Sequence, residues 1–135
     1  MIKDDINTRE DVALLVDQFY KKVRANAILG PIFNQAITNW DQHLDHLTTF
    51  WESSLFMGKP LKKKYIGNPL EVHVKVDQAN NNSITEHHFG IWLNLWFETI
   101  EHLFTGENAE LAKRRARKMG TFIHLKIFEA RQQNS

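Results

Sequence analysis

Apolar residues recur at spacings of three and four along four long stretches of the chain, and this pattern is typical of amphipathic helices. The stretches begin near Thr8, near Thr38, at Ser83 and near Asn108, and the last one runs to about Arg131. Apolar and polar residues do not alternate between hairpin turns, so no β-sheet is expected. The pattern therefore predicts an all-α fold with four principal helices and short connections.

Residues suited to the ends of helices support these boundaries. Three pairs have the spacing of a capping box, or approximate it: Thr8 with Asp11, Thr38 with Asp41, and Ser83 with Glu86. Gly58 and Pro60 are expected to end the second helix, and Gly106 the third. Gly30 and Pro31 predict a turn at which Pro31 opens a further short helix.

The same periodicity assigns side chains to the core or to water. In the second helix, Asp45 and Glu52 should face water, whereas His43 lies on or beside the buried face. Tyr20 lies beside the apolar stripe of the first helix, so its hydroxyl either reaches water or points into a pocket. The buried side of the last helix is expected to comprise Leu111, Met119, Phe122, Ile123 and Ile127.

Composition narrows the class of protein. With 135 residues, 42% apolar and 24% charged, the chain is expected to form one domain over residues 1–135. A net charge of +1 gives no reason to expect nucleic acid or an anionic membrane as a partner. No apolar run could span a bilayer and the N-terminus lacks a signal-peptide core, so we expect a cytoplasmic protein. The absence of cysteine excludes disulfides, Cys-ligated zinc, iron–sulfur clusters and covalently attached c-type haem.

A very short helix is predicted around His73. Asn68 can cap it, and Pro69 suits its first position, where a missing N–H costs nothing. His73 follows one turn later, between Val72 and Val74. Such a helix adds little to a core and would serve to hold the imidazole in place. A histidine among valines is also often a simple half-buried residue, so position alone leaves both interpretations open.

Common catalytic and metal-binding motifs are missing from the chain. It has no H-E-x-x-H, no acid followed by His at the third position, no P-loop, no nucleophile elbow and no dinucleotide fingerprint. What remains is a helical domain with nine Phe, four Trp and seven His. This supply suits a large, flat, apolar cofactor such as haem, whose iron is held in globins by one proximal histidine.

Five sequence blocks, taken in order, resemble the group III (P-group) truncated haemoglobins. The blocks are Phe19-Tyr20, Leu29-Gly30-Pro31-Ile32-Phe33, Trp40-x-x-His43 with Phe50-Trp51, Gly67-Asn68-Pro69-x-x-x-His73, and His88-Phe89-x-x-Trp92-Leu93. The resemblance implies a truncated globin-like, two-over-two helical sandwich that encloses a non-covalent haem b. One departure is the segment 75–83, which is longer and richer in asparagine than the family's usual turn.

The resemblance also implies roles for individual residues. His73 matches the proximal iron ligand, Tyr20 the distal-pocket tyrosine, His43 the distal or gating histidine, and Trp92 the pocket indole. Further residues expected to contact the haem are Phe33, Leu47, Phe50, Trp51 and Tyr65. The basic loop Lys62–Lys64 beside Tyr65 either pairs with the haem propionates or is a solvated connection.

The function implied is the binding of O₂ or another small ligand, such as NO, CO, cyanide or peroxide. Tyr20 and Trp92 supply O–H and N–H donors that need partners in an apolar pocket. Several donors around the ligand suit NO dioxygenation or peroxide turnover, with an external reductase as electron donor, better than they suit oxygen delivery.

Two alternatives from other classes remain open at this point. One is a cofactor-free helical interaction module that docks through a basic helix. Its docking face would be the run Lys113, Arg114, Arg115, Arg117 and Lys118. The other is a metal binder at His43 and His46, which are three residues apart.

Overall fold

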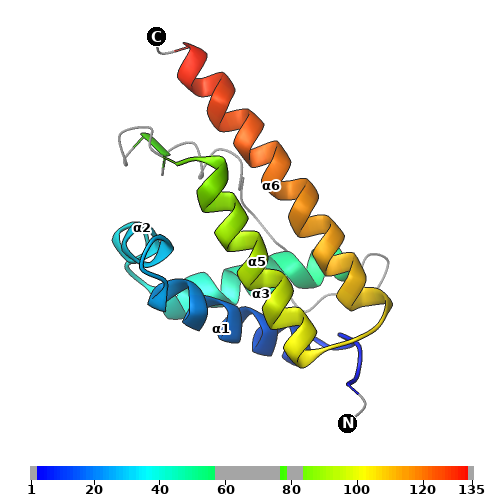
Figure 1. Cartoon of the computed structure of the whole chain (residues 1–135). Coiled ribbons are helices and arrows are strands. Elements are labelled where there is room, and N and C mark those ends of the chain that lie inside the picture. Colours follow the sequence, from blue (N-terminus) through cyan, green and yellow to red (C-terminus); the bar gives the residue numbers. More distant parts are fainter. Residues whose placement is uncertain (1–2, 57–76, 79–83, 134–135) are drawn as a thin grey trace.

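The computed structural model describes residues 3–56, 77–78 and 84–133, and these residues form helices and no strands. This confirms the predicted all-α class. The helices, labelled as in Figure 1, are α1 (Arg9–Ala25), α2 (Leu29–Ala36), α3 (Trp40–Leu55), α5 (Glu86–Leu103) and α6 (Glu107–Gln133). None of them is long and apolar enough to cross a membrane within the described ranges.

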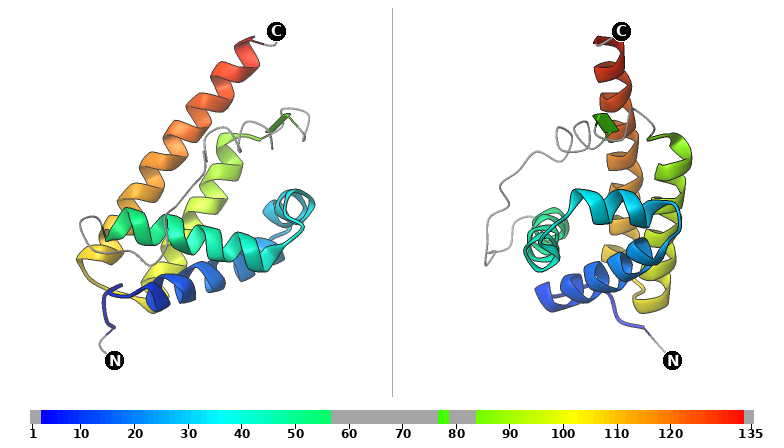
Figure 2. Two further views of the ribbon diagram at one scale, coloured as in Figure 1. Left: turned by 180° about the vertical axis from the view of Figure 1, so that it is seen from behind. Right: turned by 90° about the vertical axis from the view of Figure 1, so that its left-hand side faces the viewer.

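Two pairs of helices form two layers that cross each other. α1 packs against α3, and α5 packs against α6 (Figure 1, Figure 2). α1 also contacts α5 and thereby joins the two layers. The short helix α2 packs on α1 and reaches α5. This arrangement leaves a space that α1, α2 and α3 border on one side and α5 and α6 on the other.

The first helix begins where its sequence predicts. The hydroxyl of Thr8 accepts the backbone N–H of Asp11, and the Asp11 carboxylate accepts the N–H of Thr8, so the capping box is complete. Its buried face follows the predicted stripe: Val12, Leu15, Val16, Phe19, Tyr20 and Val23.

Two other predicted caps fall on neighbouring residues. Asn39, not Thr38, caps α3, and its side chain accepts the backbone N–H of Gln42. Thr85, not Ser83, caps α5. A capping side chain must lie directly before the first helical residue to reach the free N–H groups, and these two residues occupy that position.

The predicted turn at Gly30 and Pro31 is part of α2. The helix begins at Leu29, so Pro31 lies within its first turn, where no backbone N–H is needed. Gly30 allows α2 to approach α1 closely, because a Cβ there would lie 2.6 Å from the carbonyl oxygen of Arg24.

Glu52 was expected in water and is buried instead. Only 5% of it is exposed, and its carboxylate lies 3.0 Å from the guanidinium of Arg9 on α1. A buried carboxylate requires such a partner. The prediction was wrong because the charge that compensates Glu52 comes from another helix.

The predicted buried side of α6 is only partly correct. Ile123 and Ile127 are buried, but Phe122 is 51% exposed. In the first half of the helix the buried positions are alanines, which allow α5 and α6 to approach closely: Ala109, Ala112 and Ala116.

A carboxylate from the N-terminal segment completes the start of α6. Asp5 accepts the backbone N–H groups of Asn108 and Ala109, each at 2.9 Å. Gly106, which precedes the helix, has a φ of 138°, and a Cβ there would lie 2.4 Å from the Asp5 Cγ. Glycine is therefore required at this position by both conformation and space.

Stacked indoles form the centre of the core. Trp96 is fully buried, and its ring lies 4.6 Å from that of Trp51 on α3 and 6.3 Å from that of Trp92. The Trp96 indole N–H donates to the carbonyl of Ala112 on α6 at 3.2 Å. Because Trp51 and Trp92 also reach the space between the layers, the core supports one wall of the site described next.

Candidate functional site

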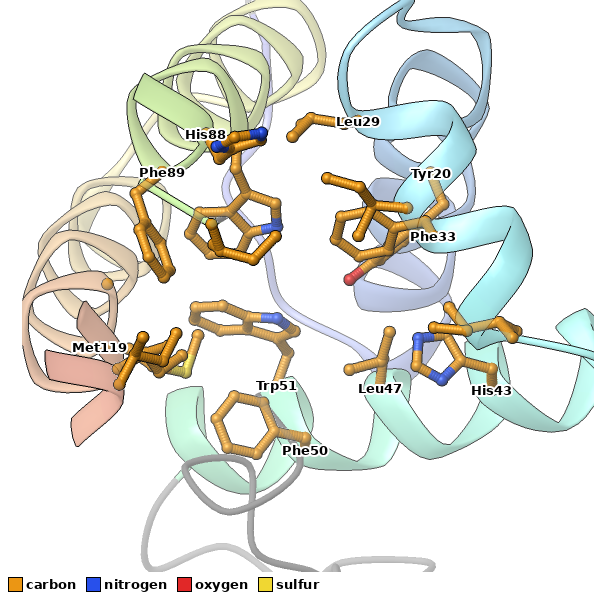
Figure 3. Close-up of a pocket in the computed structure, with 18 residues that line it drawn as sticks. Tyr20, Leu29, Phe33, His43, Leu47, Phe50, Trp51, His88, Phe89 and Met119 are labelled. Carbon is orange, nitrogen blue, oxygen red and sulfur yellow. The ribbon is translucent and has the colours of Figure 1, made fainter. Parts of the chain in front are cut away.

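A cavity of about 270 Å³ lies between the two helix layers and is bordered by all the described helices. Figure 3 shows side chains from both layers converging on it. The described lining residues are Tyr20, Leu29, Ile32, Phe33, Ala36, Ile37, His43, Leu47, Phe50, Trp51, Ile84, His88, Phe89, Trp92, Met119, Gly120, Ile123 and Ile127. None of these residues is Asp, Glu, Lys or Arg, so the cavity suits an apolar group.

Every predicted site residue that the structure describes lines this cavity. They are Tyr20, Phe33, His43, Leu47, Phe50, Trp51 and Trp92. Tyr65, His73 and the loop Lys62–Lys64 lie outside the described residues, as do the predicted helix-ending residues Gly58 and Pro60. The structure therefore brings together residues from α1, α2, α3 and α5 that are far apart in the sequence.

Tyr20 is buried, and its hydroxyl is on the cavity side (Figure 3). The indole N–H of Trp92 donates a hydrogen bond to this hydroxyl. Burial raises the pKa of Tyr20 well above its ordinary value, and the bond from Trp92 offsets only part of that effect. The phenol is therefore neutral and keeps its proton throughout the physiological pH range.

Because the Tyr20 oxygen accepts from Trp92, its own proton can be donated to a further acceptor. Aromatic rings fix the phenol on its other sides, with ring centroids 5.9 Å away for Phe33 and 5.8 Å away for Trp40. A tyrosine held in this way is a directed hydrogen-bond donor at the wall of an apolar cavity.

His43 lies next to Tyr20 on the cavity wall. Its ring centroid is 5.8 Å from that of Tyr20 and 5.7 Å from that of Trp40, both in edge-on contacts. Leu47 follows one turn later on α3 and also lines the cavity. His46, by contrast, is exposed, so His43 and His46 do not point to one site.

His88 is a cavity residue that was not among the predicted site residues. Its Nδ1 accepts the backbone N–H of Thr85 at 3.0 Å, which is one bond of a capping box. The neutral ring must then carry its proton on Nε2. Burial, followed by the neighbouring charge of His87, lowers the pKa of His88. Its four-residue spacing from Trp92 was the available signal, because residues four apart share one helix face.

Two residues of the basic run of α6, Lys113 and Arg115, have partners within the molecule. Lys113 pairs with Glu101 at 3.2 Å and Glu110 at 3.3 Å. Arg115 donates to the backbone carbonyl and the hydroxyl of Ser54 on α3. These residues are therefore engaged within the molecule, which weakens the case for a basic docking helix.

Comparison with known proteins extends over nearly the whole chain. No protein-family model matches it. Over 132 residues it is 27% identical to a curated group 3 truncated haemoglobin of Campylobacter jejuni, covering 95% of this chain and 97% of that protein. The crystal structure of a group III truncated haemoglobin from Campylobacter jejuni matches it with a TM-score of 0.79 and 28% identity, over 93% of this chain and 95% of that one.

Over nearly its whole length the chain is similar to the group III truncated haemoglobins. It has the truncated-globin fold, with α1 and α3 in one layer and α5 and α6 in the other. This confirms the resemblance inferred from the five sequence blocks and the fold class that it implied. The roles of single residues in this chain are a separate question, for which the cavity supplies the geometry.

Proposed function

We propose that this truncated-globin chain binds haem non-covalently in the cavity between its layers and holds a small ligand such as O₂ beside Tyr20. Its relationship to the group III truncated haemoglobins supports a globin-type haem-binding role. The observation that carries the proposal is the buried Tyr20 hydroxyl at the wall of an apolar cavity, beside the indole of Trp92.

The described residues fit a haem. The cavity is lined by aromatic and aliphatic side chains, and its few polar groups include the Tyr20 hydroxyl and the imidazoles of His43 and His88. A porphyrin is broad, flat and apolar, so it would replace water along these walls. The haem would supply an iron that binds the small ligand, and His73 is the residue predicted to hold that iron.

Tyr20 would act as the donor to the ligand. The bond from Trp92 occupies one acceptor position of the phenol oxygen and so orients the hydroxyl, whose proton is then donated into the cavity. Trp92 therefore acts on the ligand through Tyr20. His43, packed against the Tyr20 ring, would restrict access to the same space.

The chemistry proposed is ligand or redox turnover rather than oxygen delivery. A directed donor in an apolar cavity slows ligand release, and slow release favours a reaction at the site. NO dioxygenation and peroxide turnover are such reactions, and each would draw electrons from an external reductase.

The Tyr20→Phe variant tests this proposal in haem-loaded, reduced protein. Removing the hydroxyl removes the donor to the ligand and leaves the ring in place. Losing a hydrogen bond of about 1–3 kcal/mol corresponds to an O₂ dissociation rate faster by roughly fivefold to 150-fold. Stopped-flow measurement of O₂ release gives this rate directly.

Two further variants define the role. Trp92→Phe should raise the rate less than Tyr20→Phe, because the phenol remains but is no longer oriented. Trp40→Phe is the control: it keeps an aromatic ring against Tyr20 and changes no residue that lines the cavity, so its rate should stay close to that of the wild type. An unchanged rate in Tyr20→Phe, or protein that takes up no hemin, would contradict the proposal.

A further inference from the structure

Gly120 lies in the interior of the long helix α6 and lines the cavity. A Cβ built on it meets no other heavy atom within 4 Å among the described residues, so there is open space where a side chain would begin. Ile123 and Ile127 follow at helical spacing, are buried, and line the same cavity. The wall formed by α6 is therefore recessed by one carbon at Gly120.

Among the described residues, no neighbouring atom requires glycine at position 120. Gly30 and Gly106 differ in this respect, because a Cβ at either would collide with Arg24 or with Asp5. Glycine in a helix interior is unfavourable relative to alanine, by roughly fivefold in the equilibrium between helix and coil. A helical glycine that faces a cavity, and whose Cβ would meet no atom of the described residues, is thus accounted for by an occupant of the cavity.

We propose that the recess at Gly120 accommodates part of the haem, so that Gly120 determines what the cavity can hold. The inference rests on the proposed haem-binding function and goes beyond it, because it assigns a role to a residue with no functional group. A methyl group at this position would occupy space that the cofactor needs, since packed sites tolerate added volume poorly.

The chain contains a matched control in Gly90 on α5. A Cβ at Gly90 also meets no other heavy atom within 4 Å among the described residues, but Gly90 is exposed and does not line the cavity. Alanine should stabilise the helix equally well at Gly90 and at Gly120. The two variants therefore share the effect of helix propensity and differ only in whether the new methyl group faces the cavity.

The experiment compares the wild type, Gly120→Ala and Gly90→Ala in two measurements. The first is the rate at which hemin passes from loaded protein to an excess of a haem-scavenging protein, followed by absorption. We expect Gly120→Ala to lose hemin about tenfold faster and Gly90→Ala to match the wild type. The second is the urea midpoint of the full chain before loading, which we expect both substitutions to raise.

The outcomes separate this inference from the proposed function. Equal hemin loss in Gly120→Ala and the wild type would overturn the role of the recess and leave haem binding intact. A lower urea midpoint in Gly120→Ala would also overturn it, because glycine would then be needed by the protein's own packing. A wild-type chain that takes up no hemin would overturn the proposed function and this inference together.

Discussion

Two side chains at the cavity wall, Tyr20 and His88, each have a proton whose position depends on a neighbouring hydrogen bond. Tyr20 accepts from Trp92 and keeps its own proton for donation, and His88 accepts from Thr85 at Nδ1 and so carries its proton on Nε2. The sequence left open whether the Tyr20 hydroxyl reached water or a pocket. The structure places it in the cavity wall with 7% of the residue exposed.

His88 gives a pH-dependent contribution to stability. Its pKa is lowered in the folded protein, chiefly by burial, so the unfolded chain binds the proton more readily than the folded one. The contribution of neutral His88 is complete above the ordinary histidine pKa of about 6.5 and is lost as the pH falls through the lower folded-state value. Protonation at Nδ1 would also remove the acceptor that caps α5.

His88→Gln isolates this effect, because glutamine can complete a capping box and does not titrate. We expect the urea midpoint of the wild type to fall more between pH 8 and pH 5 than that of the variant. The two proteins differ only at position 88, so the difference between their pH dependences reports on His88. Equal pH dependence in the two proteins would show that His88 titrates alike in the folded and unfolded states.

At the scale of helices, periodicity and capping residues predicted where the helices lie. They did not predict which distant residues bond to the helix ends or pair with buried charges. Periodicity located α1, α3, α5 and α6, and the Thr8 capping box was correct because all its atoms lie within one turn. The cap of α6 comes from Asp5, about a hundred residues away in the chain. No local pattern contains that information.

Arg9 is likewise a distant partner, in this case for a buried charged residue. It pairs with Asp45 and with buried Glu52, each at 3.0 Å, and so joins the start of α1 to α3. Helical periodicity placed Glu52 on the polar face, which is correct for α3 alone. In the folded protein, α1 packs against α3 and buries Glu52.

Arg9→Met should therefore destabilise the protein by about 3 kcal/mol, because it leaves the Glu52 carboxylate buried without its partner. Lys21→Met is the matched control, since Lys21 forms an exposed pair with Asp17 within α1 and should lose less than about 1 kcal/mol. Urea denaturation measures both changes. Similar small losses in the two variants would indicate that water, rather than Arg9, stabilises the carboxylate.

At the scale of the whole molecule, the two layers assemble a cavity whose composition was only partly predictable. Seven of the lining residues on α1, α2, α3 and α5 were predicted through the family resemblance, but others on the same helices, such as His88, were not. The contribution of α6 was missed. Its Met119, Gly120, Ile123 and Ile127 line the cavity, but a glycine and three aliphatic residues have no pattern that distinguishes a cavity wall from a core.

A second set of contacts between distant segments joins the residues just before α5 to the end of α6. The Asp77 carboxylate accepts from the Arg131 guanidinium at 2.6 Å and from the backbone N–H of Ile84 at 3.0 Å. Arg131 also donates to the carbonyl of Ile84, which lines the cavity. Asp77 follows the predicted iron ligand His73 by four residues in the sequence, and Asp77 itself is held to the last helix by Arg131.

The proposal that the chain binds haem through His73 can be tested with absorption spectra of ferric, ferrous and CO-treated ferrous protein. We expect a Soret band that shifts when CO is added and that is lost or altered in His73→Ala. The ferrous spectrum would also show whether the sixth position is open or taken by His43. A wild-type protein without a Soret band even after hemin is added, or a His73→Ala spectrum identical to that of the wild type, would contradict the claim.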